Sequence, residues 1–114
     1  MSINDIALEI IKPYIGESID KNTLSRIIES TLNFNFPLIK LSKNIYTLEL
    51  FHGPTLAFKD VGARFMSRCL NHTLKNDERI TVLVATSGDT GGAVANGFMD
   101  IEGIDVVVLY PKNK

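Results

Sequence analysis

Two short apolar runs constrain the fold of this chain more than any other feature. Residues 80–85 read ITVLVA and residues 104–109 read IDVVVL. Such near-continuous runs are typical of strands that are covered on both faces. Residues 91–99, between them, have the length and composition of a short helix. A strand, a helix and a strand within about thirty residues predict a βαβ unit with parallel pairing and a right-handed crossover.

The first third of the sequence predicts two amphipathic helices. Apolar residues recur at helical spacing after Ser2, a plausible N-cap, and residues 13–16 contain the Pro and Gly that end such a helix. A second helix is predicted for residues 20–32, with Asp20 or Asn22 as its cap. Its inward-facing positions are Leu24, Ile27, Ile28 and Leu32. Neither helix carries obvious chemistry, and we interpret both as packing elements.

The middle of the chain predicts a loop, a strand and a third helix. Residues 33–37 have the composition of a loop, and residues 45–50 alternate apolar and polar side chains as a half-exposed strand does. Residues 59–74 show helical spacing again, with Cys69 on the apolar face. The sequence therefore predicts an α/β protein with one partial domain over residues 1–114. Its helical part covers residues 1–40 and its α/β part residues 41–114.

The bulk composition excludes several classes of function. The 114 residues suffice for one domain at most, and the net charge of −1 comes from scattered charges. Neither a nucleic-acid partner nor a membrane partner is therefore expected. The single Cys69 excludes an internal disulfide and a multi-thiolate metal site. With no basic leader followed by an apolar run, the expected location is the cytoplasm, and no metal is expected.

A lysine follows a Gly-Pro turn at the start of the third predicted helix. Residues 48–60 read LELFHGPTLAFKD, which places Lys59 between Phe58 and Asp60. Lysine becomes a nucleophile or forms a Schiff base only through its neutral amine. Burial beside Phe58 and residues 56–57, together with a helix N-terminus, would favour that form. The alternative is an exposed surface lysine with Asp60 capping the helix, and composition alone favours this alternative.

The loop after the first buried strand has the features of an anion site. Residues 86–92 read TSGDTGG and lie between a predicted strand and a predicted helix. We expect the N–H groups of residues 88–91 to point at a ligand, with Ser87 and Thr90 adding hydroxyl donors. The spacing matches neither a P-loop nor a dinucleotide-binding fingerprint. The alternative is a tight turn in which Asp89 or Thr90 caps the helix.

Three charged or titratable residues near these segments are further candidates. Asp89 would repel a bare phosphate, so it suits a ligand that also presents a cation or a shared proton. His52 lies in the turn before the lysine and is a candidate for lining the site. Arg64, one helical turn beyond Lys59, is suited either to an anionic group or to solvent. His72 is expected to be solvated.

The two segments closely resemble the threonine synthase family. Residues 48–60, with Gly62, Arg64 and Phe65, are similar to its cofactor-lysine segment, and residues 85–91 are similar to its substrate loop. The family belongs to the tryptophan synthase β-like, fold type II group of pyridoxal-phosphate enzymes. The resemblance therefore implies a partial domain of that fold, with N-terminal helices followed by βαβ units of a parallel sheet.

The resemblance also implies roles for individual residues. Lys59 would be the catalytic lysine that forms the Schiff base with pyridoxal 5'-phosphate, and Phe58 and Asp89 would join it in binding the cofactor. The substrate would be held through the following candidates: His52, Arg64, Thr86, Ser87, Gly88 and Thr90. The implied reaction converts O-phosphohomoserine and water to threonine and phosphate.

Threonine synthases are several times longer than this chain, so the resemblance implies a fragment that is inactive alone. The stop at Lys114, soon after a strand expected to be interior, agrees with this expectation. The strand edge left exposed after Leu109 predicts self-association. Two alternatives stay open. One is another pyridoxal-phosphate-dependent elimination lyase or dehydratase, and the other is a non-catalytic α/β module that binds anions.

Overall fold

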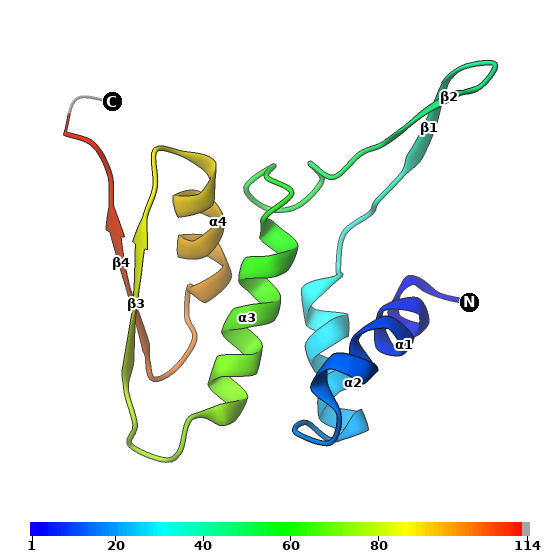
Figure 1. The fold of residues 1–114 in the computed structure, drawn as a ribbon. Coiled ribbons are helices and arrows are strands. Elements are labelled where there is room, and N and C mark those ends of the chain that lie inside the picture. The colour runs from blue at the N-terminus through cyan, green and yellow to red at the C-terminus, as the bar shows by residue number, and fades with distance from the viewer. Residues whose placement is uncertain (113–114) are drawn as a thin grey trace. The chain divides into compact units, whose positions relative to one another are not determined.

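The structure, a computed structural model, describes residues 1–112 and divides the chain into two compact units (Figure 1). The first unit is Met1–Asn33, and the second begins at Phe34. The single domain over residues 1–114, with parts 1–40 and 41–114, stays a prediction. The predicted stop at Lys114 falls at residues 113–114, outside the described residues.

The first helix, α1 (Ile3–Ile15), begins where the sequence predicts and continues past the proline. Ser2 and Asp5 form a reciprocal capping box, with the Ser2 N–H donating to Asp5 at 2.8 Å and the Asp5 N–H donating to the Ser2 hydroxyl at 3.1 Å. Pro13 removes only one helical hydrogen bond so close to the end. Gly16, at φ +60°, ends the helix, and its N–H bonds to the carbonyl of Lys12 at 2.9 Å. None of the residues of α1 is buried.

The second helix, α2 (Lys21–Thr31), carries the buried residues of the first unit. Asp20 is its cap, and its carboxylate accepts hydrogen bonds from the N–H groups of Asn22 and Thr23 at 3.0 Å each. The predicted inward residues Leu24, Ile27 and Ile28 are buried. The predicted inward position of Leu32 is only half-buried, because the helix ends at Thr31 and Leu32 follows it as the C-cap.

The second unit opens with an antiparallel hairpin that the sequence predicts only in part. Strands β1 (Leu38–Ser42) and β2 (Ile45–Leu48) pair with Leu38 opposite Leu48, and the register is irregular between Lys40 and Ser42. The predicted strand at residues 45–50 is thus shorter than expected, and β1 was not predicted. Both strands are largely exposed. With neither face buried, β1 lacks the alternation that reveals a strand in a sequence.

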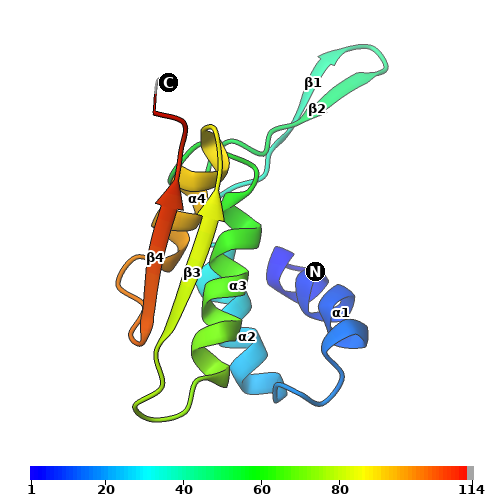
Figure 2. The same cartoon turned by 60° about the vertical axis from the view of Figure 1, so that its left-hand side comes forward.

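The βαβ prediction is confirmed. Helix α3 (Asp60–Thr73) is followed by β3 (Ile80–Ala85), α4 (Asp89–Phe98) and β4 (Ile104–Leu109). The two strands are parallel neighbours, with Ile80 opposite Ile104 and Ala85 opposite Leu109 (Figure 2). The third helix and both strands agree with their predicted ranges, whereas α4 begins two residues before the predicted Gly91.

The prediction that these strands are covered on both faces is wrong for the described chain. Helices α3 and α4 lie on one side of the sheet (Figure 1). Alternate strand residues face them and join the core around Phe98. The other face of the sheet is apolar and exposed, with Leu83 65% and Leu109 50% accessible to solvent. We call the exposed Leu83, Val107 and Leu109 the outer sheet face.

Helices α3 and α4 approach closely because small residues meet between them. A Cβ atom added at Gly97 would lie 2.9 Å from the carbonyl carbon of Ala63 and 3.0 Å from its side chain. Ser67 is fully buried at the same contact, and its hydroxyl donates to the carbonyl oxygen of Gly97 at 2.6 Å. This contact fixes the separation of the two helices, whose N-termini carry Lys59 and Asp89.

Candidate functional site

The turn before Lys59 is folded back onto the start of α3. The N–H of Leu56 donates to the carbonyl of Gly53 at 3.1 Å, and Leu56 adopts a left-handed φ of +60°. Asp60, the first residue of α3, is 1% exposed and holds this turn. Its carboxylate accepts the N–H of Thr55 at 2.9 Å and also accepts the Thr55 hydroxyl. Lys59 therefore leaves a closed turn at the N-cap position of the helix.

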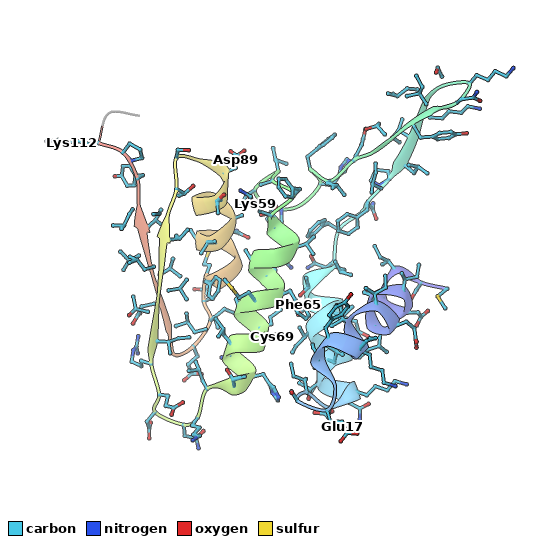
Figure 3. The ribbon with its side chains drawn as sticks, viewed as in Figure 1. Glu17, Lys59, Phe65, Cys69, Asp89 and Lys112 are labelled. Atoms are coloured by element: carbon cyan, nitrogen blue, oxygen red, sulfur yellow. The ribbon has the colours of Figure 1, made fainter. Side chains whose placement is uncertain are left out.

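The side chain of Lys59 points to the first turn of the neighbouring helix. Its Nζ donates to Thr90 Oγ1 at 2.5 Å and lies 5.6 Å from the ring centroid of Phe58. Figure 3 shows Lys59 and Asp89 at the same end of the α3–α4 pair. Of the two alternatives left open for Lys59, the described chain has the exposed one, because Lys59 itself is exposed and Phe58 and Leu56 are 65% and 71% exposed.

Lys59, Phe58 and Asp89 line one hollow. Its volume is about 350 Å³. The residues that complete its wall are apolar: Leu48, Leu50, Phe51, Leu56 and Ala57. The predicted cofactor-binding residues are thus brought together from the turn before α3 and the start of α4. The hollow combines an amine, a carboxylate and an aromatic ring above an apolar wall.

The 86–91 loop uses some of its own donors internally. The N–H of Gly88 donates to Thr86 Oγ1 at 3.1 Å, and the N–H of Gly91 donates to the carbonyl of Gly88 at 2.9 Å. The expectation that both groups point at a ligand is therefore wrong. Among the hydrogen bonds of residues 1–112, none uses the N–H of Asp89 or Thr90 in the first turn of α4. These two groups are the donors at the positive end of that helix.

The N-cap residue of α4 differs from expectation, and close contacts explain why Gly91 is a glycine. Gly88, with an extended φ of 174°, occupies the N-cap position in place of the predicted Asp89 or Thr90. None of the loop glycines Gly88, Gly91 and Gly92 has a left-handed φ. Gly91 is required by space instead, because a Cβ atom there would collide with the Thr86 methyl group and lie 3.1 Å from Val108. The helix thus packs directly on the ends of both strands.

Three of the predicted substrate-binding residues line a second hollow. Thr86, Ser87 and Gly88 form part of its wall, and its volume is about 280 Å³. The other residues of its wall are Gly91, Gly92, Val108, Tyr110 and Pro111. Consecutive residues of the same loop line the two hollows: Asp89 lines the first hollow and Gly88 the second.

His52 and Arg64 line neither hollow. His52 Nε2 lies 2.7 Å from Glu49 Oε2, and its ring stacks on Phe51 with the centroids 4.8 Å apart. The guanidinium of Arg64 lies 5.8 Å from the ring centroid of Phe34. The roles of these two residues in binding substrate stay predictions. Glu49 was not predicted, although its spacing of three residues from His52 was a visible signal.

Cys69 is half-buried, and its burial raises the pKa of the thiol, which lowers its reactivity. Within residues 1–112, no group of three or more metal-ligating side chains gathers at one place. No helix in that range has both the length and the apolar character needed to cross a lipid bilayer.

The sequence and the fold of the chain are similar to those of proteins of known function. No model of a known protein family matches the chain. It is 50% identical over 106 residues to threonine synthase from Haemophilus influenzae, covering 93% of this chain and 25% of that protein. The crystal structure of threonine synthase from Escherichia coli matches with a TM-score of 0.90 and 40% identity. That match covers 100% of this chain and 26% of the solved one.

A second solved structure is a threonine synthase with bound PLP, from Brucella melitensis. Its TM-score is 0.90 at 36% identity, covering 98% of this chain and 25% of that one. The chain thus spans about a quarter of the length of the relatives it matches. The predicted resemblance to threonine synthase, as a segment of it, is confirmed in sequence and in fold.

Proposed function

We propose that this chain supplies the lysine and the substrate loop of a pyridoxal-phosphate-dependent threonine synthase. The observation that carries this proposal is the meeting of Lys59 with the first turn of α4. Its Nζ donates to Thr90 at 2.5 Å, and Asp89 lines the same hollow. The similarity to a PLP-bound threonine synthase supports the same cofactor for this chain.

The residues present fit this cofactor. When bound, pyridoxal phosphate supplies an aldehyde that reacts with an amine and a ring that stabilises negative charge on carbon. Lys59 would hold the group through its amine, and the exposure of that amine leaves it accessible. Phe58 would offer an aromatic face, and Asp89 would accept or share a proton at a polar atom of the ring. The apolar wall formed by Leu48 and Leu50 suits an aromatic ligand.

The substrate loop would hold the carboxylate of O-phosphohomoserine. The N–H groups of Asp89 and Thr90 lie at the positive end of α4, where anions are stabilised. Ser87 and Thr86 would add hydroxyl donors from the second hollow. Lys59, within reach of this helix end, would move protons at the substrate carbons, and the net reaction would convert O-phosphohomoserine and water to threonine and phosphate.

The activity and partners of the 114-residue chain are a finer part of the proposal. Since the chain spans about a quarter of its relatives, we expect it to capture the cofactor without turning over substrate. Its partner would be the small-molecule substrate, in the cytoplasm. The outer sheet face would drive self-association, because it exposes Leu83, Val107 and Leu109.

One observation favours a second candidate function, an α/β module that binds anions without catalysis. Lys59 is exposed and donates to a neutral hydroxyl, as an ordinary surface lysine does. In such a module the lysine would attract an anion to the helix end and form no covalent bond. The two functions therefore differ in whether Lys59 is labelled.

The deciding experiment is a titration of the purified chain with pyridoxal phosphate, followed by borohydride reduction and peptide mapping. We expect an imine absorbance band and a label concentrated on Lys59. Lys59→Arg keeps the charge and should lose both signals, whereas Lys43→Arg, on the exposed hairpin turn, should keep them. Binding without a label on Lys59 would favour the anion module. Labelling spread over all lysines would contradict the proposed function.

A further inference from the structure

Asp60 follows the exposed Lys59 in the sequence, yet its buried carboxylate contacts Thr55. Neighbouring residues on a helix do not share a face. Asp60 is 1% exposed, and both of its oxygens accept hydrogen bonds from Thr55. No ion pair among residues 1–112 joins it to Lys59. Its effect on the lysine is therefore one of position.

Gly53 shows how tightly the carboxylate holds the turn. A Cβ atom at this position would overlap the Asp60 carboxylate and lie 3.0 Å from the Asp60 Cβ. Gly53 is buried and has no left-handed φ, so the nearby carboxylate is what requires glycine there. Thr55 and Gly53 are thus both fitted to one side chain at the start of α3.

We propose that Asp60 is a positioning residue for Lys59. By binding Thr55 through both oxygens, it closes residues 53–58 onto the helix and fixes the direction in which Lys59 leaves the backbone. This direction brings Nζ to Thr90 and to the hollow that contains Asp89. The inference rests on the proposed function, because it gives the lysine its position at the site of cofactor attachment.

Two measurements on a set of matched variants test this role. The first is the NMR cross-peak between the Lys59 ε-methylene and the Thr90 methyl group, compared with cross-peaks in the core around Phe98. The second is the pyridoxal phosphate concentration that gives half-maximal labelling of Lys59. Thr55→Val removes the hydroxyl at nearly constant volume, Thr55→Ser keeps it, and Asp60→Asn exchanges one acceptor oxygen for a donor. Thr73→Val makes the same chemical change at the exposed far end of α3.

We expect Thr55→Val and Asp60→Asn to lose the Lys59–Thr90 cross-peak while they keep the core cross-peaks. Each should raise the half-labelling concentration about tenfold, as loss of a hydrogen bond to a charged group does. Thr55→Ser and Thr73→Val should stay within about twofold of the unchanged chain. If Thr55→Val also loses the core cross-peaks, Asp60→Asn decides by the same two measurements.

Retention of the Lys59–Thr90 cross-peak in Asp60→Asn would overturn the inference. A failure of the proposed function gives a different result. In that case the unchanged chain carries no label on Lys59, and the cross-peaks alone decide whether Asp60 positions the lysine. A general loss of stability without a selective loss at Lys59 would show that Asp60 serves only folding.

Discussion

The hydroxyl of Ser67 donates to the carbonyl oxygen of Gly97 at 2.6 Å, and this buried bond joins α3 to α4 where no side chain separates them. Lys59 lies at the start of one of these helices and Thr90 in the first turn of the other. Their hydrogen bond at 2.5 Å therefore depends on a contact about two helical turns away. A substitution at Gly97 should therefore alter the position of Lys59 relative to Thr90.

Gly97→Ala should separate the two helices. The added Cβ atom would lie 2.9 Å from the carbonyl carbon of Ala63 and 3.0 Å from the backbone nitrogen of Arg64, which cannot move aside as a flexible side chain could. We expect the free energy of unfolding to fall by about 1–3 kcal/mol, the usual cost of overpacking. Urea denaturation followed by circular dichroism measures this change, and labelling of Lys59 by pyridoxal phosphate should weaken with it.

Gly92→Ala is the matched control for this prediction. It lies in the same helix, and a Cβ atom there would meet nothing within 4 Å. Alanine should stabilise the helix by about 0.5–1 kcal/mol. An equal loss of stability in both variants would show that the tight approach of α3 and α4 at Gly97 is unimportant.

Charges on the outer sheet face should prevent self-association. Leu83 and Leu109 are 65% and 50% exposed on adjacent strands, an arrangement that favours contact with another apolar surface. We expect the unchanged chain to sediment as oligomers at high concentration and Leu83→Lys/Leu109→Lys to sediment as a monomer. Asn76→Lys, on an exposed loop, controls for added charge and should still associate. Monomeric behaviour of the unchanged chain would contradict this prediction.

The first unit should lose helix stability in acid through its two capping carboxylates. Hydrogen bonds from Thr23 lower the pKa of Asp20 below 3.8, and hydrogen bonds from Ser2 lower that of Asp5. Because the folded pKa values are the lower ones, this stabilisation is complete above the unfolded value near 3.8. It is lost as the pH falls below 3.8 through the folded values.

The substitution Asp20→Asn distinguishes the contribution of Asp20 to the acid transition from that of Asp5. Asparagine caps a helix about as well as aspartate but does not titrate in this range. The variant should match the unchanged chain at neutral pH and lose less helical circular dichroism between pH 4 and 2, a window of about two units around the unfolded value. Identical acid curves for both chains would show that the Asp20 cap contributes nothing to the acid transition.

The βαβ unit could be predicted because its residues carry one consistent signal. The runs that end at Ala85 and Leu109 are rich in β-branched residues, which are enriched in strands, and the short segment between them leaves room only for a crossover helix. Burial of Leu24, Ile27 and Ile28 followed from helical spacing in the same way. Local pattern and final structure agree at these positions, so the sequence was sufficient.

Other features depend on contacts that no periodicity records. Strand β1 is paired on an exposed hairpin, so Leu38 and Leu41 show no buried face. The hydrogen bonds from Thr55 to Asp60 span five residues of an irregular turn. The sequence left burial and exposure of Lys59 open, and Phe58 beside it turns outward, leaving the ring 65% exposed. Such outcomes are decided by the direction of single side chains.

The parallel pairing of β3 with β4 also sets an order of events during protein synthesis. The N–H of Thr86 bonds to the carbonyl of Leu109 at 2.9 Å, and Val108 packs where Gly91 begins its turn of α4. The 86–91 loop therefore has no complete frame until residues 104–109 have left the ribosome. Lys59 is made some fifty residues earlier, so the nascent chain carries an unassembled loop until β4 emerges.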